Sequence, residues 1–249
     1  MKIIEMLNDK NIRKKINDIH NEIYNLMHKI LFIFDKYNIK YTIAHGTLMG
    51  QVRNNNLLLW DDDIDFIIDN DTIIDTKKFK EDCYNIGLSI IITPYNQGYS
   101  AKYRITDHKF LNTIPSIEPI LGDSHFTFPK IMADIHDSQY YRVHYPRWSP
   151  DENKWKRIDI TNAKLTTLGP LNIYIPNEPL YVLKTFIKFN DINDVVITHL
   201  HSNGISNFFS DYINKSKLPY TLHKKEIKAI HDFYKSSDYT IIIKKINVQ

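Results

Sequence analysis

The feature that most constrains the fold is an alternation of carboxylate and apolar side chains over residues 63–69, with the sequence DIDFIID. A period of two predicts a β-strand with one buried face. Asp63 and Asp65 then lie on the same face, roughly 6 to 7 Å apart along the strand, while the apolar residues between and after them point into a core. Two carboxylates this close repel each other unless a cation lies between them. The segment therefore predicts a core strand with a cation site on its polar face.

The expected cation is Mg²⁺ or Mn²⁺, because hard divalent ions prefer carboxylate oxygens and accept phosphate oxygens as further ligands. Zinc is less suited, because no clear histidine pair is evident and the chain has one cysteine. His199 and His201 are close in sequence but lack an evident third ligand. The alternative is that residues 61–65 form only an acidic turn that caps a strand. We expect Asp61 and Asp62 to be turn residues.

A Gly-Thr turn lies upstream of the acidic strand. Residues 39–44 are predicted to form a short strand, from which residues 45–47, with the sequence HGT, turn the chain into a brief helical segment over residues 48–54. Glycine lets a ligand approach the backbone closely, and amides at a helix start can hold phosphate oxygens. Arg53 is predicted to add a charge-assisted contact to the phosphates.

The segments HGTLMGQVR at residues 45–53 and LLLWDDDIDF at residues 57–66 resemble the LicD family, which includes bacterial phosphocholine transferases and the eukaryotic fukutin and fukutin-related proteins. That family is similar to a branch of the nucleotidyltransferase-fold superfamily, in which a Gly-Ser or Gly-Thr turn and an Asp-x-Asp pair bind nucleotide phosphates through Mg²⁺. The resemblance implies that Gly46 and Thr47 form this turn and that the aspartate pair ligates the metal.

The superfamily pattern also implies a third carboxylate on a neighbouring strand, and residues 131–136, IMADIH, supply Asp134. A strand here places Asp134 and His136 on one face. The alternative for Asp134 is an aspartate in an edge strand or turn. We expect His136 to be a structural histidine, and a contact with substrate is its alternative. The predicted catalytic and metal-binding residues are therefore Asp63, Asp65 and Asp134, with Asp134 as general base.

Two further segments are candidates for substrate binding. Lys102 and Arg104 lie on one face of a strand predicted over residues 100–106, where they are predicted to neutralise substrate phosphate; solvated strand side chains are the alternative. Residues 140–157 mix aromatic and basic side chains, which predicts a loop that holds acceptor or nucleotide. An ordinary surface loop is the alternative for this segment.

The predicted fold class is α/β (α+β), a nucleotidyltransferase-like mixed sheet flanked by helices. Apolar residues recur every three or four positions over residues 12–34, which predicts a long helix that begins near Asn8 or Asp9 and packs on the sheet. Its mixed-charge polar face argues against the alternative, a membrane-surface helix. A looser similarity to the family over residues 165–189 predicts a hairpin that turns at Gly169-Pro170 and a helix from Pro179. We expect a single domain with an N-terminal helix (1–38), a catalytic core (39–190) and a mostly helical C-terminal extension (191–249).

Composition narrows the classes of function. The chain has 32 basic and 29 acidic residues among 249, a balance that does not by itself indicate nucleic-acid binding. We do not expect nucleic acid as a partner. One cysteine excludes an intrachain disulfide and a multi-cysteine zinc site. No apolar run approaches the roughly 18 residues that a membrane-spanning helix needs. We expect a cytoplasmic protein without a transmembrane segment or signal peptide.

The resemblance implies a metal-dependent transferase that moves phosphocholine or a polyol phosphate, such as ribitol phosphate, from a CDP-linked donor to a glycan hydroxyl. One alternative is nucleotidyl transfer from a nucleotide triphosphate to a small molecule or an RNA end, which uses the same type of site. Another is a glycan- or nucleotide-binding protein without turnover. The intact aspartate pair and Gly-Thr turn argue against the last alternative.

Overall fold

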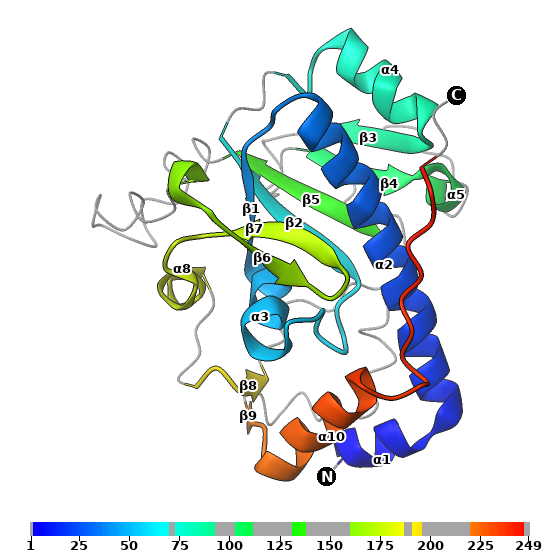
Figure 1. Ribbon diagram of the computed structural model, residues 1–249, viewed down its shortest axis with the longest axis vertical. Helices are drawn as coiled ribbons and strands as arrows, with labels where there is room; N and C mark the ends of the chain where they lie inside the picture. Colours follow the sequence, from blue (N-terminus) through cyan, green and yellow to red (C-terminus); the bar gives the residue numbers. More distant parts are fainter. Residues whose placement is uncertain are drawn as a thin grey trace, which may run out of the picture.

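The computed structural model describes residues 2–69, 73–92, 103–111, 131–137, 160–186, 191–195 and 220–246. At its centre lies a five-stranded sheet with the strand order β1-β2-β5-β4-β3 (Figure 1). Its strands are β1 (Tyr41–Ile43), β2 (Asp63–Ile68), β3 (Leu88–Ile92), β4 (Tyr103–Asp107) and β5 (Met132–Asp137). The predicted α/β fold, a mixed sheet flanked by helices, is confirmed.

The sheet is mixed because β2 pairs in parallel with β5, whereas the other described pairs of this sheet, β1 with β2, β5 with β4 and β4 with β3, are antiparallel. The predicted strand forms as β2, and Ile64 and Phe66 are fully buried as expected. Burial does not alternate along it, however, because Asp65 and Ile67 are also buried. Asp65 of β2 lies directly opposite Asp134 of β5. The polar positions of two neighbouring strands therefore meet near the centre of the sheet.

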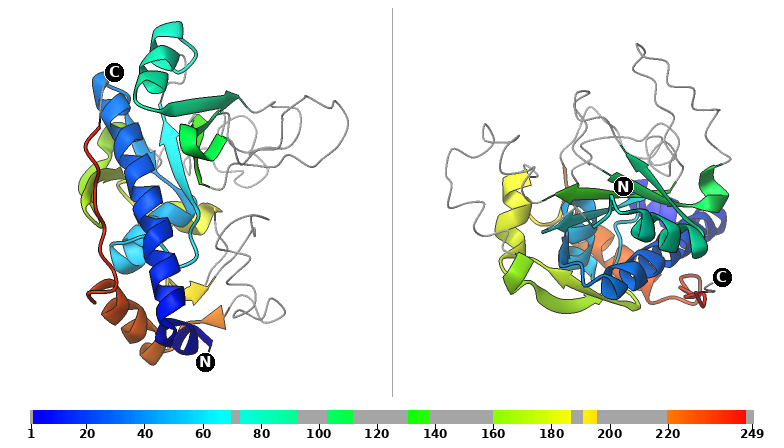
Figure 2. Two further views of the ribbon diagram at one scale, coloured as in Figure 1. Left: turned by 90° about the vertical axis from the view of Figure 1, so that its right-hand side faces the viewer. Right: turned by 90° about the horizontal axis from the view of Figure 1, so that it is seen from above.

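Helix α2 (Lys10–Lys36) runs along one face of this sheet (Figure 2). The carboxylate of Asp9 accepts hydrogen bonds from two backbone amides of the first turn, at 2.8 and 3.4 Å, and so caps the helix where the sequence predicted its start. The apolar stripe of α2 reaches β2, where the rings of Phe34 and Phe66 lie 5.4 Å apart. A short helix that the sequence analysis did not predict, α1 (Lys2–Asn8), precedes it.

Helix α3 (His45–Asn54) follows β1 almost directly. We expected residues 45–47 to form a turn before the helix, but they form its first turn. The physical reason is that the amide of Leu48 donates to the carbonyl of Ala44 at 2.8 Å, which closes a helical turn at this point. Asn55, in the left-handed region at φ 50°, ends the helix.

A hairpin and a helix follow the sheet, as the sequence predicted. Strands β6 (Lys164–Leu168) and β7 (Leu171–Ile175) pair in antiparallel fashion, and α8 (Pro179–Phe186) begins at the expected proline. Gly169 in the turn has φ 52°, and a Cβ there would lie 2.5 Å from the hydroxyl of Tyr24. The turn therefore requires glycine for both conformation and space.

The other described elements are short. They are α4 (Lys77–Asn85), α5 (His108–Leu111), the 3₁₀ turn η2 (Ile160–Asn162), the strand pair β8 (Asp194–Val195) and β9 (Tyr220–Thr221), and α10 (Lys224–Tyr234). Among the residues described after position 190, α10 is the one helix. The expectation that this part is mostly helical stays a prediction, because residues 196–219 lie outside the described residues. The predicted division of the chain into one domain with two extensions stays a prediction. None of the helices in the described ranges is long and apolar enough to span a membrane.

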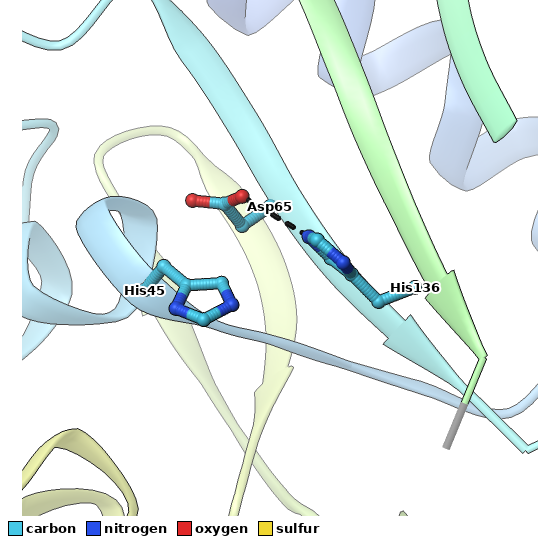
Figure 3. Close-up of side chains that lie close together, drawn as sticks. All are labelled: His45, Asp65 and His136. Carbon is cyan, nitrogen blue, oxygen red and sulfur yellow. Dashed lines mark hydrogen bonds and ion pairs between the residues drawn. The ribbon is translucent and has the colours of Figure 1, made fainter. Parts of the chain in front are cut away.

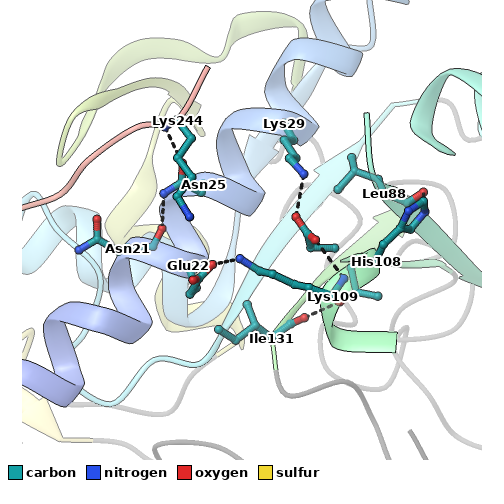
Figure 4. Close-up of polar contacts among 11 residues, drawn as sticks. Asn21, Glu22, Asn25, Lys29, Leu88, His108, Lys109, Ile131 and Lys244 are labelled. Carbon is teal, nitrogen blue, oxygen red and sulfur yellow. Dashed lines mark hydrogen bonds and ion pairs between the residues drawn. The ribbon is translucent and has the colours of Figure 1, made fainter. Parts of the chain in front are cut away.

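The C-terminal segment runs alongside α2 (Figure 1) and is held there by a ladder of asparagines, of which Figure 4 shows the contact between Asn25 and Lys244. Asn17, Asn21 and Asn25, spaced four residues apart, accept hydrogen bonds from alternate backbone amides of residues 240–244, at 2.7 to 2.8 Å. Asn21 and Asn25 also donate to backbone carbonyls of this segment at 2.8 and 2.9 Å. One face of the helix thus satisfies the backbone of an extended segment, much as a neighbouring strand would.

Helix α2 is also tied to the far end of the sheet (Figure 4). The Lys29 ammonium lies 2.7 Å from the carboxylate of Asp107 at the end of β4, and Lys109 of α5 forms an ion pair with Glu22. These contacts fix β4, which is the neighbour of β5 in the sheet, relative to the long helix α2.

Candidate active site

Three aspartates from the two parallel strands gather at one place. β2 carries Asp63 and Asp65, and β5 carries Asp134 opposite Asp65. One carboxylate oxygen of each residue lies within 4.8 Å of the other two. The parallel pairing of β2 and β5 therefore brings together all three residues predicted from the sequence.

This cluster is electrostatically unfavourable without a cation. Burial raises the pKa of Asp63 well above its usual range, and the negative charges of Asp65 and Asp61 raise it further. All of its ligand atoms are carboxylate oxygens, the donors that Mg²⁺ and Mn²⁺ prefer. The residues present therefore fit the metal that the sequence analysis expected.

Arg104 of β4 lies beside the cluster. Its Nε donates to Oδ1 of Asp134 at 2.8 Å, and its Nη2 donates to Oδ2 at 3.5 Å. The two side chains are 7% and 11% exposed, so the pair is largely shielded from water. Arg104 therefore orients one of the three carboxylates, and the substrate contact predicted for it stays a prediction. Lys102, predicted to act with it, lies outside the described residues.

The first turn of α3 packs against the carboxylate strand. The hydroxyl of the buried Thr47 accepts a hydrogen bond from the backbone amide of Asp65 at 3.0 Å. At Gly46, a Cβ would lie 2.8 Å from Oδ1 of Asp61. Glycine therefore admits the Asp61 carboxylate beside the helix N-terminus, whose positive partial charge favours it. The phosphate contacts predicted for Gly46 and Thr47 stay predictions.

Asp61 and Asp62 lie between α3 and β2, outside any helix or strand, as expected of turn residues. Each is only 7% exposed, however. The charges of both raise the pKa of Asp63, after burial and the charge of Asp65. Asp61 and Asp62 thus form part of the turn and also add negative charge next to the carboxylate cluster.

Two histidines form a second cluster with Asp65 (Figure 3). His136 of β5 is 1% exposed, and its Nε2 lies 3.4 Å from Oδ1 of Asp65. The ring of His45, the first residue of α3, lies 5.2 Å from the ring of His136. Burial lowers the pKa of His45 to about 4, against an opposing effect of the Asp65 charge. One ligand atom of each of the three residues lies within 4.8 Å of the other two.

A family model described as LicD/FKTN/FKRP, nucleotidyltransferase domain, matches residues 38–178. The match covers more than half of the 249 residues and includes every residue of both clusters. The chain belongs to the LicD family. LicD proteins are generally transferases, and the family indicates a phosphotransferase-like activity that modifies glycans. The comparison with curated proteins returns no match.

Arg53 lies within the LicD match but binds backbone. Its Nε and Nη2 donate to the carbonyls of Ile192 and Asp194, at 2.9 and 2.7 Å. Its guanidinium also lies 5.9 Å from the ring of Trp60. Arg53 therefore joins α3 to the segment that contains β8, and the phosphate contact predicted for it stays a prediction.

His45 and His136 lie within the matched region, and the sequence analysis did not assign either of them to a metal site. The alternation in β5 did place His136 on the face of Asp134, which was the available signal. The meeting of the two histidines depends on two strand pairings, the antiparallel pairing of β1 with β2 and the parallel pairing of β2 with β5. The aromatic and basic segment 140–157 and the pair His199 and His201 lie outside the described residues.

Proposed function

We propose that this LicD protein is a metal-dependent transferase that moves a substituted phosphate group from a CDP-linked donor to a glycan hydroxyl. The group is phosphocholine or a polyol phosphate such as ribitol phosphate. Mg²⁺ or Mn²⁺ is held by Asp63, Asp65 and Asp134.

The observation that carries this proposal is the carboxylate cluster. Three aspartates from two neighbouring parallel strands offer oxygens within 4.8 Å of one another, inside the region matched by the family. The raised pKa of Asp63 supports a bound cation, because a divalent ion would offset the repulsion between the neighbouring carboxylates. The cluster also lies against the first turn of α3, where backbone amides favour negative charge.

The residues of the chain have distinct roles in this proposal. Asp63 and Asp65 would hold the cation with the help of Asp134, and Gly46 and Thr47 position the donor phosphates. Asp134, oriented by Arg104, accepts the proton of the attacking glycan hydroxyl. The new bond joins this hydroxyl oxygen to the phosphorus of the transferred group, and the bond from that phosphorus to CMP breaks. The cation supplies stabilisation of the negative charge on the donor phosphates.

The test compares donors by thermal unfolding and by product. The full chain is mixed with CDP-choline, CDP-ribitol, CDP-glycerol or nucleotide triphosphates, with and without Mg²⁺. A donor at a hundred times its Kd stabilises the fold by about 2.7 kcal/mol. We expect a Mg²⁺-dependent shift with one CDP compound, and release of CMP when a glycan acceptor is added.

The alternatives give different products. Pyrophosphate released from a triphosphate indicates nucleotidyl transfer, and ligand binding without product in any mixture indicates a binding protein. Asp63→Ala combined with Asp65→Ala should abolish CMP release. If this double variant binds every donor as the parent does and no mixture shows Mg²⁺-dependent turnover, the proposal is wrong.

A further inference from the structure

We propose that His45, Asp65 and His136 form a second metal site, which binds a divalent transition-metal ion of the zinc or cobalt type and shares Asp65 with the carboxylate site. This inference goes beyond the proposed function, since it requires neither a CDP-linked donor nor turnover. It also revises the expectation from sequence that zinc is less suited than Mg²⁺ to this chain, which rested on the lack of nearby cysteine and of an evident histidine pair.

The three side chains converge on one point (Figure 3). In a tetrahedral site with bonds of about 2.0 to 2.1 Å, neighbouring ligand atoms lie roughly 3.4 Å apart. Nε2 of His136 and Oδ1 of Asp65 are already 3.4 Å apart. All three ligand atoms lie within 4.8 Å of one another, which is close to the spacing of a metal site.

The types of ligand atom select the metal. Two imidazole nitrogens and one carboxylate suit zinc, cobalt, iron or nickel better than Mg²⁺, which prefers oxygen. Three protein ligands leave at least one position open for water or a substrate oxygen. The cluster of Asp63, Asp65 and Asp134 offers oxygens alone, so the two clusters differ in the ions they prefer.

Each ligand is fixed by the fold. His136 is 1% exposed on the central strand β5, and the amide of Asp65 is anchored by the Thr47 hydroxyl at 3.0 Å. His45 has φ 40°, a left-handed conformation that is uncommon for a residue with a side chain and tends to occur at functional sites. The backbone at the start of α3 thus carries strain at the residue that completes the cluster.

Asp65 belongs to both clusters and lies between them in the fold. Its two carboxylate oxygens allow it to bridge a hard ion on one side and a softer ion on the other. Shared carboxylates of this kind occur in two-metal sites, in which both ions stabilise charge on the reacting oxygens. Binding at the histidine cluster can nevertheless be measured without any donor.

The test uses metal alone. The full chain, stripped of metal with a chelator and dialysed, is titrated with Co²⁺ while the visible absorption of the bound ion is recorded, and with Zn²⁺ by calorimetry. We expect one equivalent of Co²⁺ to bind with visible absorption bands. Loss of a partner outside the ligand shell typically weakens metal binding by roughly 10- to 100-fold, so His45→Ala or His136→Ala should weaken it by at least about a hundredfold.

Controls separate this site from others. Asp63→Asn should keep the Co²⁺ bands while losing the stabilisation by Mg²⁺, since Asp63 belongs to the carboxylate cluster alone. His231→Ala, at an exposed position of α10, should bind Co²⁺ as the parent does. The same result is expected for His199→Ala with His201→Ala, the other histidine pair considered in the sequence analysis.

The outcomes are distinct from those that test the proposed transfer. If Co²⁺ gives the absorption bands but no CMP is released, the second metal site is supported and the proposed transferase activity is wrong. Co²⁺ binding that is unchanged in His45→Ala, or that is lost in His199→Ala with His201→Ala, overturns the second site. If His136→Ala does not fold, the Co²⁺ titration of His45→Ala decides the result, because the His45 side chain is only partly buried.

Discussion

Asp65 and Asp134 lie directly opposite each other on the parallel strands β2 and β5, with Asp63 two residues before Asp65. A strand pair that brings carboxylates together creates repulsion in the folded state, because the negative charges lie close together and burial favours the neutral acid. The carboxylates that are proposed to bind the cation therefore also lower the stability of the metal-free protein.

We therefore predict that Asp63→Asn stabilises the metal-free protein. The substitution keeps the shape of the side chain and removes one of the repelling charges, so the midpoint of thermal unfolding in EDTA should rise by a few degrees. Mg²⁺ should raise the midpoint of the parent and leave the variant unchanged. Asp69→Asn, just after β2 and outside both clusters, is the control. A fall of the midpoint in EDTA would mean that Asp63 has a stabilising partner instead.

The ion pair between Arg104 and Asp134 gives a second prediction. Both side chains are largely buried, so Arg104→Met leaves the Asp134 charge without its cation and should lower the free energy of unfolding by about 3 kcal/mol. Arg104→Met combined with Asp134→Asn should recover part of this loss in urea unfolding. The exposed pair Lys14 and Asp18 is the control, where Lys14→Met should cost at most about 0.5 kcal/mol.

The same variant separates two roles of Arg104. If this residue only orients Asp134, Arg104→Met changes the rate of CMP release more than the KM for the donor. A large rise in KM with unchanged stability would instead support the substrate contact predicted from the sequence.

Gly46 gives a third prediction. A Cβ there would lie 2.8 Å from Oδ1 of Asp61, so Gly46→Ala should cost about 1 to 3 kcal/mol of unfolding free energy. Asp61→Ala removes the obstructing atom and should reduce the cost of the glycine substitution in a double-mutant cycle. At Gly50 the obstructing atoms are backbone, with the carbonyl oxygen of Asn56 at 2.5 Å. Gly50→Ala should therefore be more severe, and Asp61→Ala should not relieve it.

Much of the fold was predictable because its signals are local. The alternation in β2, the cap at Asp9 and the Gly169-Pro170 turn each act within a few residues, and each element formed where expected. The start of α3 was placed too late, since the hydrogen bond that closes its first turn comes from backbone and leaves no mark in the side chains.

The candidate site could be predicted only in part, because several of its contacts join residues that are far apart in the sequence. Asp63 and Asp65 share one strand, and a resemblance supplied Asp134. The contacts between different strands were not predictable. Arg104 reaches Asp134 across the pairing of β4 with β5, and His45 meets His136 through the pairings of β1 with β2 and of β2 with β5. Local periodicity assigns a residue to a face, but it does not say which strands are neighbours.

The asparagine ladder on α2 gives a fourth prediction. Asn21 and Asn25 each make two hydrogen bonds to the backbone of residues 240–244, so either Ala variant should release this segment. We expect faster hydrogen exchange at the amides of Ile242 and Lys244, with the exchange of β2 unchanged. Asn11→Ala, exposed at the start of the same helix, is the control. Equal protection in all three variants would show that apolar contacts hold the segment.

His20 gives a prediction for pH. It is fully buried, with Nε2 donating to the carbonyl of Leu58 at 3.1 Å and Nδ1 lying 2.9 Å from the hydroxyl of Tyr239. Burial lowers the pKa of His20 to about 3, against an unfolded value of 6.5, with the Leu58 carbonyl opposing the shift. Between about pH 3 and pH 6.5, His20 is therefore neutral in the folded state and protonated in the unfolded state. Above pH 6.5 neither state binds it, and the contribution of His20 to stability is complete.

Below pH 6.5 the stability contributed by His20 falls by about 1.4 kcal/mol per pH unit, until the folded state also takes the proton near pH 3. Urea unfolding at pH 7.5, 6.5, 5.5 and 4.5 measures this slope. His20→Gln should be less stable than the parent at pH 7.5, because buried hydrogen bonds are disturbed, but its stability should fall less steeply with acid. His231→Gln, at an exposed histidine, should keep the slope of the parent. Parallel curves for the parent and His20→Gln would show that acid acts through other groups.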